Sequence, residues 1–168
     1  MIIREAVVQD WPDIFPVFRA IVADGRTYTY PDGLSSDEAR ALWMARPPGR
    51  TVVAVDGGTL LGTATMGPNR PGRGSHVATA SFMVHPDHHG AGVGRRLGGD
   101  ALRWARDAGY RGMQFNAVVE TNRAAVHLWQ SLGFRILTTV PEAFDHPEHG
   151  LVGLHVMYQR LVPEDGTA

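Results

Sequence analysis

The sequence predicts an α/β fold, in which a mixed sheet of about seven strands is covered by about four helices. Three observations support this prediction. Short apolar stretches recur along the chain, four longer stretches have the apolar spacing of amphipathic helices, and turns rich in glycine and proline separate them. The resulting order, β-α-α-β-β-β-α-β-α-β-β, is typical of an α+β layered domain with helices on the faces of its sheet.

The first elements are a strand and two helices. A short strand opens the chain, and a helix begins near Pro12, with Asp10 as a candidate N-cap. The apolar positions of this helix have the spacing of one buried face: Ile14, Val17, Phe18, Ile21 and Val22. A polar and aromatic loop leads to a second helix, which has Ser35 or Ser36 as its N-cap and stops at the proline pair of residues 47–48.

The middle of the chain contains three strands and a helix. Two apolar stretches flank Asp56-Gly57-Gly58, which is a hairpin signal. A third strand ends before Pro86, and a glycine-rich segment then leads into a helix that ends at Gly109. The buried face of this helix is expected to consist of Val93, Leu97, Ala101, Trp104, Ala105 and Ala108.

The last elements are a strand, a helix and two closing strands, at residues 112–120, 121–134, 134–141 and 151–161. Residues 142–150 are expected to form a polar loop between the closing strands. We expect one domain over residues 1–162 and a disordered tail over residues 163–168.

Composition excludes several classes of function. A formal net charge of -1 argues against a general nucleic-acid-binding protein. No apolar run approaches the roughly 20 residues that cross a bilayer, and the N-terminus lacks a signal-peptide pattern, so we expect a cytoplasmic protein with no membrane partner. The absence of cysteine excludes disulfides and thiol nucleophiles, and the absence of lysine excludes Schiff-base chemistry.

Residues 84–96, VHPDHHGAGVGRR, place histidines and glycines directly before a predicted helix. Three interpretations are open: a metal site at the histidines, a phosphate-binding loop at the glycines, or a tight turn without function. Glycine lets main-chain N–H groups approach a ligand, and the start of a helix leaves N–H groups unpaired and favours an anion. Arg95 and Arg96 add positive charge, although they could instead form a solvated face.

The metal interpretation and two known phosphate-binding motifs do not fit the neighbouring residues. The candidate metal ligands are His85, His88 and His89, with His146 and His149 as a second group. The first group has only Asp87 as a carboxylate neighbour, and the second lies in a polar loop, so we expect no metal. A Walker loop needs lysine, which this chain lacks. A dinucleotide fingerprint needs its glycines after the first strand of a βαβ unit, whereas these glycines follow several strands.

Two linked motifs point to one enzyme family. The first reads His89-Gly90-Ala91-Gly92-Val93-Gly94, and the second is formed by Asn122, Ala125, Leu128, Trp129, Gly133 and Phe134. They resemble the Gln/Arg-x-x-Gly-x-Gly/Ala and Asn-x-x-Ala-x-x-Leu-Tyr-x-x-x-Gly-Phe motifs of the GCN5-related N-acetyltransferase (GNAT) superfamily. The resemblance extends through the element order of residues 1–161. It implies the GNAT fold, with a mostly antiparallel sheet, and acetyl transfer from acetyl-CoA to an amine.

The resemblance implies a cofactor site along the end of one strand and the glycine-rich loop. Main-chain N–H groups of residues 91–96 would hold the diphosphate of coenzyme A, and the Val84 N–H would point at the thioester carbonyl. Asn122 matches a family residue that contacts the pantetheine arm. The full set of expected cofactor-binding residues is Met83, Val84, His85, His89, Gly90, Ala91, Gly92, Val93, Gly94, Arg95, Arg96, Asn122 and Trp129.

Two departures from the family pattern concern the catalytic groups. Trp129 stands where the family has a tyrosine that protonates the leaving thiolate, and an indole N–H is too weak an acid for that role. The candidate replacements are Tyr28, Tyr30 and Tyr158, unless the thiolate leaves without an acid. Ala117 stands where some members have a glutamate base, which leaves Glu120, His76 and His85 as candidates. The expected catalytic residues are Val84, Asn116 and Glu120.

The expected acceptor is a small amine or amino acid, bound by Tyr28, Tyr30, His76 and Asn116. This expectation uses a weaker similarity to fungal N-acetyltransferases of azetidine-2-carboxylate, which also have tryptophan in the second motif and an amide side chain at the position of Asn116. A homodimer is expected by analogy with the superfamily.

Structural roles remain open for several of these residues. The two tyrosines could pack the loop, Asn116 could make a structural hydrogen bond, Trp129 could be a core residue, and Glu120 could cap a helix together with Thr121. The competing functions are a catalytically weak acyl-CoA sensor or scaffold, and an enzyme that acts on hydroxyl groups or transfers longer acyl groups.

Overall fold

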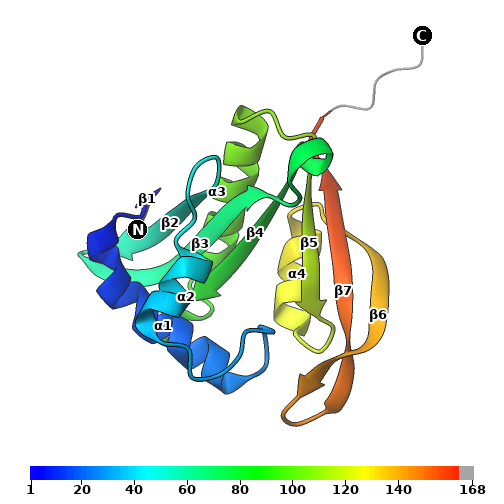
Figure 1. Ribbon diagram of the computed structural model, residues 1–168, viewed down its shortest axis with the longest axis horizontal. Coiled ribbons are helices and arrows are strands. Elements are labelled where there is room, and N and C mark those ends of the chain that lie inside the picture. Colours follow the sequence, from blue (N-terminus) through cyan, green and yellow to red (C-terminus); the bar gives the residue numbers. More distant parts are fainter. Residues whose placement is uncertain (163–168) are drawn as a thin grey trace.

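The computed structural model describes residues 1–162, and these residues form one seven-stranded sheet in the order β1-β2-β3-β4-β5-β7-β6 (Figure 1). The strands are β1 (Ile2–Glu5), β2 (Arg50–Asp56), β3 (Thr59–Pro68), β4 (Val77–Val84), β5 (Gly112–Val119), β6 (Arg135–His146) and β7 (Gly150–Arg160). β4 and β5 are parallel, and every other neighbouring pair is antiparallel. The predicted mixed, mostly antiparallel sheet is confirmed. The tail predicted at residues 163–168 lies outside the described residues.

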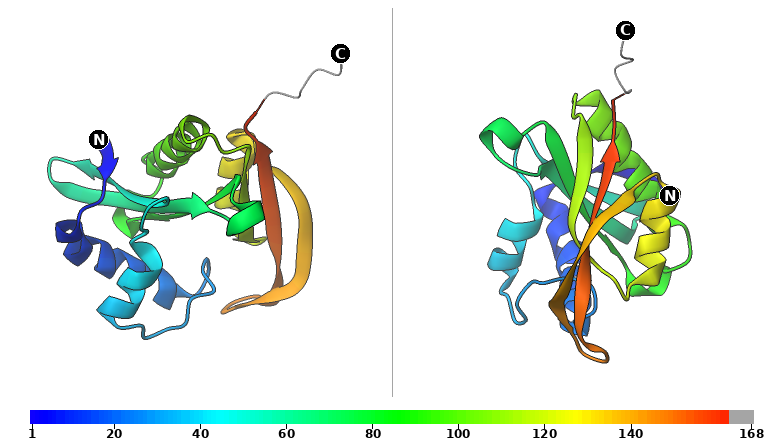
Figure 2. Two further views of the ribbon diagram at one scale, coloured as in Figure 1. Left: turned by 45° about the horizontal axis from the view of Figure 1, so that its top comes forward. Right: turned by 90° about the vertical axis from the view of Figure 1, so that its right-hand side faces the viewer.

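Two helices cover each face of the sheet, as Figure 2 shows for α1, α2 and α3. The α-helices of the described chain are α1 (Trp11–Asp24), α2 (Ser36–Trp43), α3 (Val93–Asp107) and α4 (Arg123–Ser131). On one face, α1 and α2 bury Phe18 and Trp43 against Val53 and Met83 of the sheet. On the other face, α3 and α4 pack on the alternate strand residues, so the strands that lie between the helices are apolar on both faces. No helix within residues 1–162 has both the length and the apolar composition to span a bilayer.

Helix starts show where local sequence signals succeed and fail. Ser35 caps α2 as predicted, because its hydroxyl accepts from the Glu38 N–H at 3.3 Å and the Glu38 carboxylate accepts from the Ser35 N–H at 2.8 Å. Asp10 occupies the N-cap position of α1, as predicted, but its side chain makes no capping hydrogen bond to the helix. Its carboxylate accepts from the Val7 N–H and pairs with Arg4 at 2.7 Å, so it closes the turn before the helix.

The polar loop expected at residues 142–150 is mostly strand. β6 continues to His146, and only residues 147–149 remain between it and β7. A register shift between Val140 and Phe144 lets the strand continue after Pro141. Phe144 then packs on Val152, and this buried contact outweighs the polar composition that favoured a loop.

The parallel strands β4 and β5 pair over only two residues before they diverge (Figure 1). The pairs are Val77 with Gly112 and Ala78 with Met113. Beyond them, three aromatic rings fill the space on the α4 side. Phe82 of β4, Phe115 of β5 and Trp129 of α4 have ring centroids 4.7 to 5.8 Å apart. We call the diverging part of β4 and β5 the wedge.

Candidate active site

The main chain of β4 presents alternate residues to the wedge. The His85 N–H donates to the Leu61 carbonyl at 2.9 Å, and the Asn69 N–H donates to the Val77 carbonyl at 2.7 Å. Odd-numbered residues of this segment therefore direct their main-chain groups toward β3. Because successive residues of a strand alternate, Phe82 and Val84 direct theirs toward β5.

This alternation reduces the number of β4 residues whose main-chain N–H could contact a cofactor. Val84 turns its N–H into the wedge, as the predicted contact with the thioester carbonyl requires. Met83 is 1% exposed and packs with α1 and α2, and the His85 N–H is bonded to β3. Of the three predicted residues, only Val84 has a main-chain N–H available to a cofactor in the wedge. The sequence reasoning missed Phe82, although residues two positions apart in a strand, such as Phe82 and Val84, direct their main-chain groups to the same side.

The glycine-rich loop has the shape of an anion site. Gly90 and Gly92 have left-handed φ values of 81° and 76°, and a Cβ placed at either would meet nothing within 4 Å. Gly92 is the N-cap of α3, and no side chain caps this helix. The first N–H groups of α3 are therefore not covered by a capping side chain, and the space outside them is open. These features fit a diphosphate.

Gly94 has a different role from the other loop glycines. A Cβ there would lie 3.1 Å from the Leu128 Cδ2, so this glycine allows α3 to approach α4 closely. Gly94 thus has a packing role, and its predicted contact with the cofactor stays a prediction. Ala91 and His89 lie exposed beside Gly90, and Val93 is buried beneath the helix start.

Arg95 and Arg96 are exposed and flank the helix start on two sides. The Arg95 guanidinium donates to the Ser131 hydroxyl of α4 at 2.8 Å, and the Arg96 guanidinium donates to the Met1 carbonyl at 3.1 Å. Both residues belong to the first turn of α3, and their positive charge favours an anion near this helix start.

Two residues of the second motif, Asn122 and Trp129, have structural contacts. Asn122 is the N-cap of α4, and its Oδ1 accepts from the Ala125 N–H at 3.1 Å. Trp129 is 7% exposed and contacts the rings of both Phe82 and Phe115. The departure from tyrosine therefore places an indole ring, which has no hydroxyl, on the α4 side of the wedge.

Tyr28 reaches the wedge from the loop between α1 and α2. Its hydroxyl donates to the Phe82 carbonyl at 2.6 Å and accepts from the Phe82 N–H at 3.0 Å. Burial of this hydroxyl raises the pKa of Tyr28 well above its ordinary value, so the phenol keeps its proton. The Tyr30 ring stacks on Tyr28 at 5.4 Å, and burial also raises the pKa of Tyr30. Tyr28 thus contacts β4 directly, and Tyr30 contacts the Tyr28 ring.

Asn116 is part of an amide network at the surface of β5. Its Oδ1 accepts from Gln114 Nε2 at 2.9 Å, and its Nδ2 donates to Asn69 Oδ1 at 2.6 Å. The register shift of β5 after Phe115 gives this part of the strand an irregular course. Sequence reasoning missed both partners, although the alternation of Gln114 and Asn116 along one strand was a usable signal.

Two further predicted residues make hydrogen bonds to neighbouring main-chain groups. Glu120 Oε1 accepts from the Gly153 N–H at 2.5 Å, which ties the end of β5 to β7. His76 is exposed before β4, and its carbonyl accepts from the Arg111 N–H at 2.9 Å. It stands at the closed end of the wedge, about 20 Å along the strand from Phe82, which is too far for a role at Val84.

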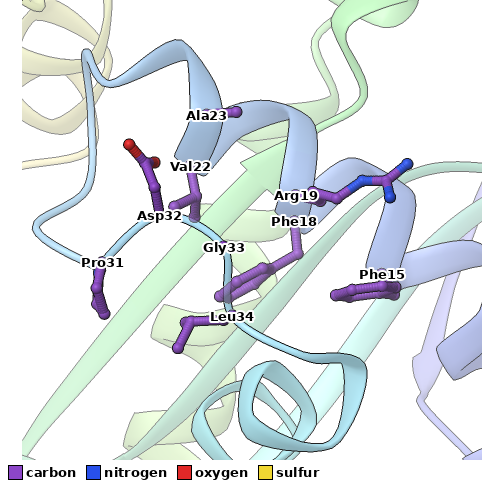
Figure 3. Close-up of a pocket in the computed structure, with 9 residues that line it drawn as sticks. All are labelled: Phe15, Phe18, Arg19, Val22, Ala23, Pro31, Asp32, Gly33 and Leu34. Carbon is purple, nitrogen blue, oxygen red and sulfur yellow. The ribbon is translucent and has the colours of Figure 1, made fainter.

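Within residues 1–162, no three or more histidine and acidic side chains lie close enough together to hold an ion. A small apolar pocket lies between α1 and the segment before α2 (Figure 3). Phe18 and Leu34 line it, with Arg19 and Asp32 among the polar residues.

Comparison with known proteins identifies the family. The acetyltransferase (GNAT) family model matches residues 9–134, which is most of the chain. The L-amino acid N-acyltransferase MnaT of Escherichia coli is 32% identical over 127 residues, which cover 75% of this chain and 71% of that protein. N-acetyltransferase aca1 of Schizosaccharomyces pombe is 38% identical over 88 residues, which are 52% of this chain and only 42% of that protein.

Solved structures agree with this assignment. A GCN5-related N-acetyltransferase from Kribbella flavida has a TM-score of 0.93 and 58% identity, covering 95% of this chain and 97% of its own. YncA from Salmonella typhimurium, solved with acetyl-CoA, has a TM-score of 0.82 and 26% identity, covering 100% and 98%. The chain belongs to the acetyltransferase (GNAT) family, and the predicted family, fold, enzyme class and family cofactor, acetyl-CoA, are confirmed.

Proposed function

We propose that this protein transfers the acetyl group of acetyl-CoA to the amine of a small, amino-acid-like acceptor, by direct attack in a ternary complex. The observation that carries the proposal is the divergence of β4 from β5 beside an uncapped helix start. Two relatives support the acceptor class. MnaT is named an L-amino acid N-acyltransferase, and a 30% identical relative from Salmonella typhimurium is named a methionine sulfoximine and methionine sulfone acetyltransferase.

The proposed cofactor site uses main-chain donors. N–H groups of residues 91–96 would hold the diphosphate, with Arg95 and Arg96 beside it. Val84 would donate its N–H to the thioester carbonyl, where negative charge develops. When bound, acetyl-CoA supplies an acyl carbon activated by its bond to sulfur. The chain itself supplies orientation and charge stabilisation.

The proposed acceptor site lies near the two tyrosines and Asn116. The amide of Asn116 is oriented by Gln114 and Asn69, so it can present a fixed hydrogen-bonding group to a carboxylate or an amine. Glu120 remains our predicted base, with its Oε1 bonded to Gly153. Trp129 supplies no proton, because it has no acidic hydrogen at neutral pH.

A screen of thiol release tests the proposal. Acetyl-CoA is offered with a panel of amino acids and small amines, and at least one is expected to give turnover that depends on the acceptor concentration. Cofactor binding measured by calorimetry, without turnover on any amine, would instead support the sensor or scaffold. Turnover on alcohols alone, or with longer acyl donors alone, would support an enzyme that acts on hydroxyl groups or transfers longer acyl groups.

We also propose a cytoplasmic homodimer. Exposed apolar side chains on the last two strands support a second copy as the partner, since β6 is at the edge of the sheet: Ile136, Leu137, Val140 and Leu151. Light scattering after gel filtration is expected to give twice the chain mass of 18.3 kDa. A Leu137→Asp variant should then run as a monomer.

A further inference from the structure

The Tyr28 hydroxyl takes the place of a missing strand neighbour at Phe82. One oxygen satisfies both main-chain groups that Phe82 turns toward β5, with distances of 2.6 Å to the carbonyl and 3.0 Å to the nitrogen. In a closed sheet these groups would bond to β5, but the strands diverge after Ala78. The phenol therefore lies inside the wedge, at the level of Phe82.

The Tyr28 ring is held by neighbours on several sides. It stacks on Tyr30 with an interplanar angle of 7°, and its edge packs against Trp43 at 6.1 Å. Trp43 is itself fixed, because its Nε1 donates to the Thr63 hydroxyl at 3.1 Å. Displacing the Tyr28 ring would break these contacts together with both hydrogen bonds to Phe82, so it forms a rigid wall.

The position of this wall matters for a donor that enters from the α3 end. The glycine-rich loop follows Val84, so a chain that runs from the loop along β4 passes Val84 before it reaches Phe82. Two residues of a strand span about 6.8 Å. An acyl group whose carbonyl accepts from the Val84 N–H has room for a methyl group in this interval, whereas several methylenes would reach the Tyr28 hydroxyl.

We propose that Tyr28 determines the length of the acyl group that the site accepts, by closing the wedge at Phe82. The proposal rests on the proposed acyl-CoA site at Val84. A longer acyl chain has to displace the phenol, which leaves the Phe82 N–H and carbonyl without their partners, and such unpaired groups are costly away from water. The preference for acetyl over longer donors thus comes from a residue that lies outside both family motifs.

The test measures kcat/KM for acetyl-, propionyl-, butyryl- and hexanoyl-CoA with one acceptor. For the wild-type protein we expect the value to fall by about tenfold or more between acetyl- and butyryl-CoA, as one or two excess methylenes do in a shaped pocket. Tyr28→Leu removes the wall and should raise the butyryl-to-acetyl ratio by a similar factor. Tyr110→Leu is the matched control, because Tyr110 packs on Trp104 away from the wedge. It should leave the ratio unchanged.

The outcomes separate this proposal from the proposed function. Equal use of hexanoyl- and acetyl-CoA by the wild type, or an unchanged ratio in folded Tyr28→Leu, would overturn the role of Tyr28. If Tyr28→Leu does not fold, the wild-type series and Tyr28→Phe decide. Tyr28→Phe keeps the ring but loses both hydrogen bonds, so it should raise the ratio. If no acceptor is acetylated, calorimetry with the same thioesters still tests the length limit by affinity.

Discussion

Arg26 and Glu148 form an ion pair of 2.5 Å between two loops that are 122 residues apart in sequence. Arg26 lies in the loop that carries Tyr28, and Glu148 lies in the turn between β6 and β7. The neighbouring residues Gly25 and Pro147 also approach each other, since a Cβ on Gly25 would be 3.8 Å from the proline ring. The ion pair thus connects the loop between α1 and α2 to the turn between β6 and β7.

Breaking this ion pair should affect acceptor binding more than stability. Both side chains are about half exposed, and such pairs contribute at most about 1 kcal/mol to folding. In Glu148→Gln we expect little change in melting temperature and a several-fold higher acceptor KM, because the loop around Tyr28 and Tyr30 is less restrained. Arg103→Gln, which breaks an exposed pair on α3, is the control. Equal acceptor KM values in both variants would contradict the prediction.

A bulky residue at Gly92 should weaken cofactor binding. The left-handed backbone makes any substitution cost about 1–2 kcal/mol, and the side chain of Gly92→Leu would occupy the open space outside the first N–H groups of α3. Gly58→Leu is matched, because Gly58 has a φ of 85° and open space in a distant turn. Titration calorimetry with acetyl-CoA should show at least about tenfold weaker binding for the first variant only. Unchanged affinity would remove the loop from the cofactor site.

Local signals in the sequence were sufficient for most of the elements and for the shape of the glycine-rich loop. Ser35 with Glu38 marked the start of α2, and glycines at 90 and 92 marked the loop before α3. These features depend on residues a few positions apart, whose preferences are properties of the backbone itself. The extent of β6 was not predictable in the same way, because Phe144 is buried by a strand that comes later in the chain.

The contacts that form the candidate site join residues that are far apart in the sequence, so local signals could not predict them. Tyr28 meets Phe82 over 54 residues, and Asn69 meets Asn116 over 47. Neither contact follows from composition or spacing, since each depends on where β4 and β5 diverge. The sequence nominated Tyr28 and Asn116 through the resemblance to the family, and the same reasoning nominated His76, which lies at the closed end of the wedge.

Asn116 should contribute to acceptor binding and not to cofactor binding. Asn116→Ala removes the amide that Gln114 and Asn69 orient, so we expect the acceptor KM to rise about tenfold while the acetyl-CoA KM changes less than about twofold. Asn69→Ala should give a smaller change of the same kind, because it only releases Asn116. Gln9→Ala, an exposed amide before α1, should change neither value. A rise in the acetyl-CoA KM alone would place Asn116 on the cofactor side.

The ion pair between Arg4 and Asp10 should make stability depend on pH. Hydrogen bonds from the Arg4 guanidinium, followed by the Val7 N–H, hold the pKa of Asp10 below its usual value of 3.8. Because the folded-state pKa is the lower one, the stabilisation is complete above the unfolded-state value and is lost as the pH falls through the folded-state value. Urea unfolding should therefore show Asp10→Asn less stable than wild type at pH 7, with the difference shrinking below about pH 4. When Asp10→Asn is introduced into Arg4→Gln, the loss of stability at pH 7 should also be smaller, because the ion pair is already broken. A stability difference between Asp10→Asn and wild type that stays constant from pH 7 to pH 3 would show that the carboxylate charge contributes nothing.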